Sequence, residues 1–122
     1  MPTFEAVGFT PPAPVVTALV RGPSGMTQHG VRLLIDSGAD VSVLPLAAAH
    51  AVGAQMEPSD VPVQFFSGEQ ASYLQASLSI EFLRYRFRCV FLLTDADYGI
   101  VGRNILNLLL ITLDGPRLFW TA

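Results

Sequence analysis

The stretch LLIDSGADVSVL, residues 33–44, places Asp36 directly after an apolar run and follows it with Ser37 and Gly38. A second apolar run begins just after Asp40. An ionised carboxylate in a buried setting costs several kcal/mol unless it is paired, hydrogen-bonded or protonated. Asp, Ser and Gly are also common turn formers, so the tripeptide alone is compatible with a solvated turn. Asp36 is therefore the first candidate functional residue, and its interpretation depends on the rest of the chain.

Length and composition favour one compact domain. The chain has 122 residues, of which 51% are hydrophobic, and a formal net charge of −3. This is enough for a single hydrophobic core. No apolar run approaches the ~20 residues that cross a bilayer, and the first residues lack the basic-then-apolar order of a signal peptide. We therefore expect a soluble, cytoplasmic protein without a membrane partner.

The arginines, the cysteine and the histidines of the chain give no sign of a nucleic-acid or metal site. All basic residues are arginines, either scattered or alternating as in LRYRFR (83–88), so no basic patch indicates nucleic acid. The single Cys89 cannot form an internal disulfide, and the run RCVFLL favours a small core residue there. The two histidines lack Cys or carboxylate partners at ligand spacing. We expect neither a metal nor another cofactor.

The first half of the chain indicates a leader, a hairpin and a helix. Residues 1–14 contain four prolines and predict an extended Pro-rich leader, followed by a domain of residues 15–122. VVTALVRG (15–22) and VRLLID (31–36) are separated by turn residues and predict a hairpin. PLAAAHAVG (45–53) predicts a short helix, with Pro at its first position and Gly at its end.

The second half returns to strands. VPVQFF (61–66) and ASYLQASLSIEFL (71–83) flank the turn SGEQ and predict a second hairpin. YRFRCVFLL (85–93) alternates polar and apolar residues, so we expect it to pair with the preceding strand. A brief helix follows within 98–110, and ITL (111–113) and RLFW (117–120) end the chain. The pattern predicts an all-β domain, closed or sandwich-like, with two short helices.

Two motifs of the chain resemble those of the retropepsin-like aspartic proteases. IDSGA (Ile35–Ala39) resembles the Asp-Ser/Thr-Gly-Ala signature of that family. IVGRNIL (Ile100–Leu106) resembles its second motif, in which two apolar residues and Gly lead into Arg-Asn and a helix. The resemblance covers roughly residues 15–113. It implies a single-lobe closed barrel with a flap hairpin, one or two short helices and a C2 homodimer.

The family chemistry requires two carboxylates. An aspartic protease activates a water between two carboxyl groups that share one proton, because like charges about 3 Å apart cannot both ionise. Asp36 is the only acid of this chain that is followed by Ser/Thr-Gly. The resemblance therefore implies an obligate homodimer with Asp36 of both copies as the catalytic dyad, acting on extended peptide or protein substrates.

The resemblance also assigns roles around Asp36. Ser37 would hydrogen-bond across the dimer axis, and Gly38 would let the substrate backbone approach and accept a substrate amide at its carbonyl. Ala39 belongs to the same supporting loop. Asp40 and Arg103 would form an ion pair beside the cleft, with Asp40 also reaching the substrate backbone.

The remaining family positions lie further along the chain. Asn104 would brace the strand after the catalytic loop through Ser42. Ser67 and Gly68 lie in the hairpin 66–69, where the family has its substrate-binding flap. The leader and residues 114–122 are extra segments, at the termini from which viral members build their dimer sheet. Side-chain pockets would be lined by Leu44, Val61, Phe65, Tyr98 and Ile100.

A second interpretation comes from another functional class. A noncatalytic dimeric β module could keep the same fold and bind extended peptides or mediate assembly. The chain could also be part of a larger protein under either interpretation. The substitution Asp36→Asn distinguishes the two interpretations, because it should abolish cleavage by a protease and leave the function of a binding module unchanged.

Overall fold

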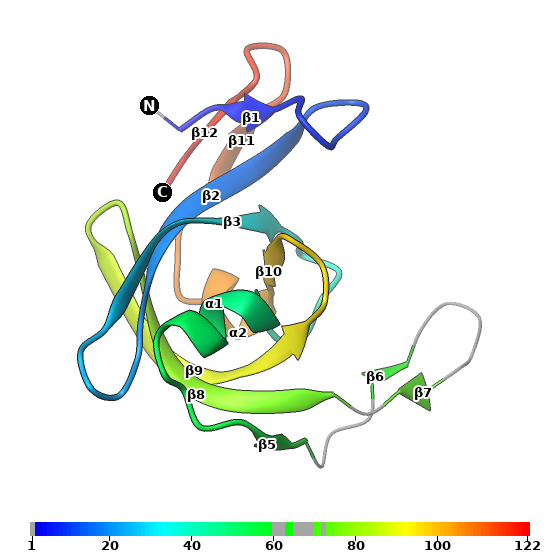
Figure 1. The fold of residues 1–122 in the computed structure, drawn as a ribbon. Helices are drawn as coiled ribbons and strands as arrows, with labels where there is room; N and C mark the ends of the chain where they lie inside the picture. The colour runs from blue at the N-terminus through cyan, green and yellow to red at the C-terminus, as the bar shows by residue number, and fades with distance from the viewer. Residues whose placement is uncertain (1, 60–62, 65–69, 72) are drawn as a thin grey trace.

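Six strands of the computed structural model close into a barrel (Figure 1). The structure describes residues 2–59, 63–64, 70–71 and 73–122. Each strand of the ring pairs with the next, and β8 returns to β2. The ring therefore confirms the predicted all-β closed barrel. Its order is β2 (Ala13–Arg21), β3 (Thr27–Ile35), β10 (Gly99–Val101), β4 (Val43–Pro45), β9 (Tyr85–Thr94) and β8 (Leu74–Phe82).

Two long antiparallel hairpins make up most of the barrel. Strands β2 and β3 pair from Val15 opposite Leu34 to Arg21 opposite Thr27, with a register shift between Ala18 and Val20. Strands β8 and β9 pair continuously from Gln75–Leu92 to Phe82–Tyr85. Alternate residues of β8 are buried, as expected for strands with one face on a core. Both hairpins agree with the alternation in the sequence.

Two short strands, β10 and β4, link the two hairpins on one side of the barrel. Strand β10 runs parallel to β3 and antiparallel to β4, and β4 runs parallel to β9. Gly99 allows this insertion, because a Cβ at that position would lie 2.1 Å from the carbonyl oxygen of Val43. The arrangement brings the end of β3 beside the end of β10, although the two strands are more than sixty residues apart in sequence.

Two short helices follow β4 and β10. Helix α1 (Leu46–Ala51) begins after Pro45, which occupies the cap position rather than the predicted first helical position. It ends before Gly53, whose φ of +69° is a conformation that glycine tolerates well. Helix α2 (Arg103–Leu106) begins directly after Gly102. Both predicted helices are therefore present.

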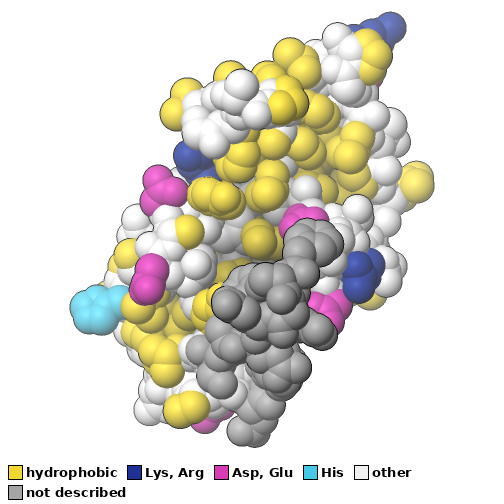
Figure 2. Space-filling view, turned by 90° about the vertical axis from the view of Figure 1, so that its right-hand side faces the viewer, with side chains coloured by type: hydrophobic (Ala, Val, Ile, Leu, Met, Phe, Trp, Pro, Cys, Tyr) yellow, Lys and Arg dark blue, Asp and Glu magenta, His cyan; other side chains and the backbone are white. Residues whose placement is uncertain are grey.

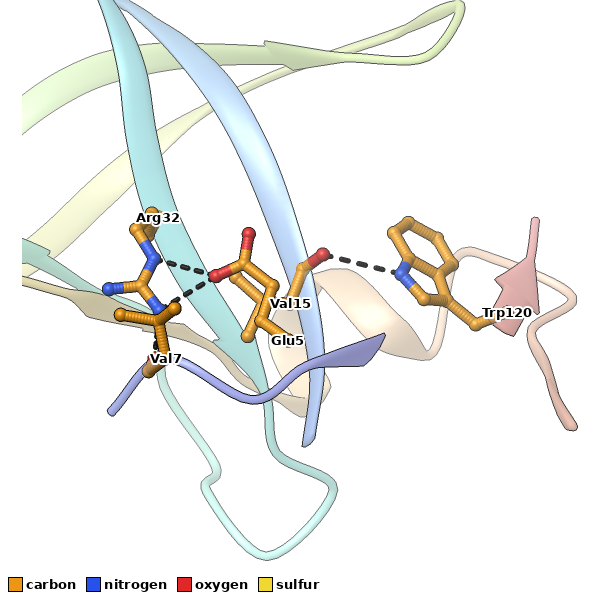
Figure 3. Close-up of polar contacts among 5 residues, drawn as sticks. All are labelled: Glu5, Val7, Val15, Arg32 and Trp120. Carbon is orange, nitrogen blue, oxygen red and sulfur yellow. Dashed lines mark hydrogen bonds and ion pairs between the residues drawn. The ribbon is translucent and has the colours of Figure 1, made fainter. Parts of the chain in front are cut away.

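The N-terminal residues differ from the predicted leader. Strand β1 (Phe4–Glu5) pairs with β2, which begins at Ala13 rather than near Val15. Glu5 forms an ion pair of 2.7 Å with Arg32 of β3 (Figure 3). Pro14 lies opposite Phe4 of β1 and precedes the part of β2 that pairs with β3, as expected for a proline near the start of a strand. Part of the predicted leader therefore lies in paired strands, Phe4–Glu5 of β1 and the first residues of β2.

The C-terminal residues form a hairpin against this N-terminal segment. Strands β11 (Thr112–Asp114) and β12 (Phe119–Thr121) pair with each other, and Thr3 bridges to Phe119. Trp120 is 1% exposed, and its indole Nε1 donates a hydrogen bond of 3.3 Å to the carbonyl of Val15 (Figure 3). Trp120 therefore attaches the terminal hairpin to the barrel core.

The remaining short strands lie around the predicted flap. β5 (Glu57–Pro58) pairs with β8, and β6 (Val63–Gln64) pairs with β7 (Gln70–Ala71). The predicted flap tip, residues 66–69, lies outside the described residues. In the part of the chain that the structure describes, no helix is long and apolar enough to span a membrane.

Candidate active site

Asp36 lies in a tight turn immediately after β3. Its backbone N–H donates to the carbonyl of Val101 at 3.0 Å, which ties the start of the turn to β10. The carboxylate Oδ1 accepts the backbone N–H of Gly38 at 2.9 Å, and the Asp36 carbonyl accepts that of Ala39 at 3.2 Å. Asp36 is half-buried as a residue, while Ser37 and Gly38 are exposed. The turn thus holds one carboxylate oxygen in place from within the chain.

Residues of the second motif contact the loop that contains Asp36 through backbone atoms. The N–H of Arg103 donates to the carbonyl of Ala39 at 2.8 Å. Gly102 lies against the same loop, because a Cβ there would approach the carbonyl oxygens of Val41 and Ala39 to 2.4 and 3.0 Å. No side chain fits into this space without displacing backbone. Gly102 therefore positions the Asp36 loop. From the sequence, Gly102 was visible only as the glycine of the second motif, and its close contact with the loop was not predicted.

A buried hydroxyl connects the two motifs, as the resemblance implied. Ser42 is fully buried, and its Oγ donates to Oδ1 of Asn104 at 2.7 Å. The same Oγ accepts the N–H of Gly102 at 2.9 Å. The hydroxyl uses both its donor and its acceptor capacity. The expected contact between Asn104 and Ser42 is present, and the role of Asn104 in supporting the site stays a prediction.

The predicted ion pair beside the cleft is absent from the described residues. Arg103 instead donates Nη1 to the carbonyl of Ser37 at 2.7 Å, and the Asp40 side chain is exposed without making an ion pair. Arg103 therefore supports the Asp36 turn directly, by binding the carbonyl of the residue next to Asp36.

The expected pocket residues have different positions. Ile100 is half-buried in β10, opposite Val43 and Leu34. Tyr98 is half-buried and packs edge-on against Phe9, with ring centroids 5.2 Å apart. Leu44 is 0% exposed and belongs to the core, which corrects its predicted role in a pocket. The Leu44 side chain of β4 is enclosed by the core, where neither solvent nor a substrate side chain contacts it. Val61, Phe65, Ser67 and Gly68 lie outside the described residues.

Two titratable groups of the barrel have shifted pKa values. Burial raises the pKa of the Cys89 thiol to about 11, and Asn104 Nδ2 lies 3.9 Å from its sulfur. Burial also raises the pKa of Glu81, but hydrogen bonds and charges from Arg21 and Arg86 outweigh this and leave that pKa below its usual value. Cys89 is therefore a protonated thiol at neutral pH.

The site residues fit carboxylate chemistry. Among the described residues, no three His, Cys, Asp or Glu side chains gather as a metal site would require. The described residues contain no buried side-chain nitrogen or oxygen that lacks a hydrogen-bond partner. The contacts that the structure does show hold Asp36 in a turn supported from β10 and α2.

Comparison with known proteins gives a structural match. No protein-family model and no curated protein sequence matches the chain. Among solved structures, the chain is similar to EIAV protease complexed with the inhibitor HBY-793. The TM-score is 0.60 at 21% sequence identity, and the match covers 78% of this chain and 86% of that chain. The chain thus has the small all-β barrel, with two short helices, of the retropepsin-like fold.

Proposed function

We propose that this chain is an aspartic endopeptidase, which hydrolyses peptide bonds with a water activated by Asp36 of two identical chains. The observation that carries the proposal is the position of Asp36. Its turn follows β3 of a retropepsin-like barrel and is held by Val101 and Arg103 of the second motif. The contacts that hold the turn come from a single segment, residues 101–103, more than sixty positions away in sequence.

The dyad needs two copies because one chain supplies one such carboxylate. An ionised Asp36 accepts a proton from water as the water oxygen attacks the peptide carbonyl carbon. The protonated Asp36 of the other chain donates its proton to the carbonyl oxygen. The carboxyl group that took the proton from water then gives it to the amide nitrogen and the C–N bond breaks, while one hydroxyl of the tetrahedral intermediate returns its proton to the other carboxylate as the new carbonyl forms. Each cycle returns one proton to the pair.

Contacts within the chain orient Asp36 before the reaction begins. The Gly38 N–H on Oδ1 fixes the orientation of the carboxylate. Ser37 and Gly38 are exposed beside it, so they are accessible to a second chain or to a substrate backbone. Arg103 holds the carbonyl of Ser37, which restricts the turn from its other side. A held carboxylate has less reorganisation to undergo during catalysis.

Peptide cleavage tests the proposal. Wild type and Asp36→Asn would each be incubated with a diverse peptide mixture from acidic to neutral pH, with products identified by mass spectrometry. Glu57→Gln is the matched control, because it makes the same acid-to-amide change on β5 and keeps an acceptor for Gln75. We expect cleavage by wild type and Glu57→Gln only. A wild-type dimer that binds peptides without cutting them would instead favour a noncatalytic module.

A further inference from the structure

Three arginines gather around one hollow on the outer face of the barrel. Arg21 ends β2, and Arg86 and Arg88 lie on β9. Together with residues of β8 and of the turn between β2 and β3, they line a space of about 370 Å³. This volume falls within the range of about 300–1,000 Å³ that is typical of ligand sites. Three of the seven basic residues of the chain therefore lie in one place.

The strand register places two of these arginines on either side of a serine. Ser79 of β8 lies opposite Arg21 of β2 and also opposite Arg88 of β9. Residues directly opposite one another in antiparallel strands point to the same face of the sheet. Leu78 and Ile80, which flank Ser79 in sequence, are buried on the other face. The two guanidinium groups and the hydroxyl therefore share the outer face, in one row across three strands.

The hollow carries positive charge that the chain does not neutralise. Glu81, the next outward residue of β8, forms ion pairs of 3.1 Å with Arg21 and 3.2 Å with Arg86. Arg88 is exposed and forms no hydrogen bond or ion pair with any residue that the structure describes. Three guanidinium charges and one carboxylate charge leave a formal charge of +2 here, in a chain whose net charge is −3. An anion in the hollow would give Arg88 a partner.

The donors of the hollow favour a phosphoryl group over a carboxylate. A carboxylate carries one charge, whereas a phosphomonoester carries a charge of about −1.5 to −2 at pH 7 and three acceptor oxygens. Neighbouring strands lie about 4.8 Å apart, so the Cα atoms of Arg21 and Arg88 are about 10 Å apart and both side chains can reach one group between them. Three oxygens match two guanidinium groups and the Ser79 hydroxyl. The charge of a phosphomonoester also matches the formal +2.

The hollow lies far from the Asp36 turn. In the first hairpin, Arg21 pairs with Thr27 beside the turn between β2 and β3, whereas Val15 pairs with Leu34 at the other end. Six residues of strand separate Arg21 from Val15, which corresponds to about 20 Å. Figure 1 shows the turn between β2 and β3 at the lower left and the loop after β3 on the right. On the right-hand face, drawn in Figure 2, arginine side chains appear as separate dark-blue spots.

We propose that this hollow binds a phosphomonoester dianion, which Arg21 and Arg88 hold from two sides with the Ser79 hydroxyl between them. Arg86 stays paired with Glu81 and adds its charge. The phosphoryl group belongs either to a small molecule or to a phosphorylated side chain of a protein, and the chemistry that is recognised is the same. The inference goes beyond the proposed function and does not rest on it, because one copy of the chain supplies every residue of the hollow.

Calorimetric titration identifies the ligand. Phenyl phosphate and a phosphoserine peptide would be titrated into the Asp36→Asn chain, which cannot cut the peptide if the proposed function is correct. Phenyl sulfate, a monoanion of similar shape, and the unphosphorylated peptide are the controls. We expect each phosphate to bind at least about tenfold more tightly than its control. Phosphates that bind no better than their controls overturn the proposal.

The same titrations distinguish the two sources of the phosphoryl group. A phosphopeptide that binds at least about tenfold more tightly than phenyl phosphate identifies a phosphorylated protein as the source, and a smaller ratio identifies a small molecule. Titration of phenyl phosphate into wild type should give the same affinity as Asp36→Asn, since the hollow is remote from that carboxylate. Loss of peptide cleavage and loss of phosphate binding are therefore separate results.

Single substitutions locate the site. Arg88→Gln removes a guanidinium without an ion-pair partner among the described residues, so the variant should fold, and we expect phenyl phosphate to bind at least about tenfold more weakly. Arg84→Gln is the matched control, because it removes the same charge from an exposed arginine between β8 and β9, outside the hollow. Screening by salt should limit its effect to less than about twofold. Circular dichroism would confirm folding. Equal losses in the two folded variants would indicate general attraction to the surface and overturn the proposal.

Discussion

The hydroxyl of Ser42 donates a hydrogen bond of 2.7 Å to Oδ1 of Asn104, across 62 positions of sequence. The same oxygen accepts the N–H of Gly102 at 2.9 Å, in a buried setting. One side chain thus fixes β4 to the start of α2, and α2 in turn contacts the Asp36 turn through Arg103. The position of the candidate catalytic carboxylate depends on this chain of contacts.

Ser42→Ala should weaken the fold measurably. The buried N–H of Gly102 loses its acceptor, and we expect the free energy of unfolding to fall by about 1–3 kcal/mol. Urea denaturation would measure the change. Ser77→Ala on the exposed face of β8 is the control and should stay within about 0.5 kcal/mol of wild type. Equal effects of the two substitutions would show that the Ser42 hydrogen bonds contribute nothing specific.

Gly102→Ala should damage both stability and the site. The added methyl group meets the backbone of Val41 and Ala39, which cannot move without moving the Asp36 turn. Overpacking of this kind costs about 1–3 kcal/mol, and peptide cleavage should fall as well. Thermal unfolding and the cleavage assay would report both. Gly115→Ala is the control because a Cβ there meets nothing within 4 Å. A Gly102→Ala protein with wild-type stability would refute the close approach.

Cys89 should react slowly until the solution is strongly alkaline. Because burial raises its pKa from 9.0 to about 11, we expect the alkylation rate of the folded protein to rise towards pH 11. The unfolded chain binds fewer protons between these values, so stability should fall as the pH rises from about 9 to about 11. Iodoacetamide labelling and urea titrations would test this. In Cys89→Ala, the loss of stability over that range should be smaller.

Local patterns predicted the hairpins and both helices. Strands β8 and β9 pair continuously. The alternation of polar and apolar residues along a strand indicates which of its faces is buried, so this pairing could be predicted from adjacent residues. Likewise, Ala-rich residues between Pro45 and Gly53 specify α1 from adjacent positions alone. The turn residues of IDSGA and the Gly-Arg-Asn of the second motif identified the two loops that the fold brings together.

Contacts between distant segments could not be predicted from local patterns. The N-terminal segment is ordered against Leu118 and Trp120, over 110 positions away, whereas its prolines suggested only an extended leader. The guanidinium of Arg103 was expected on Asp40 and binds the carbonyl of Ser37 instead. The acceptor that an arginine binds depends on small differences in the positions of the nearby oxygen atoms, and the residue types alone do not determine those positions.

Subunit mixing tests the shared dyad most directly. Wild type and Asp36→Asn would be refolded together in varied ratios at constant total concentration, and peptide cleavage would be measured, with Glu57→Gln as the control diluent. If both Asp36 carboxylates are required, activity follows the square of the wild-type fraction, so an equal mixture retains about a quarter of the full activity. Activity proportional to the wild-type fraction would contradict the account, because each chain would then act alone.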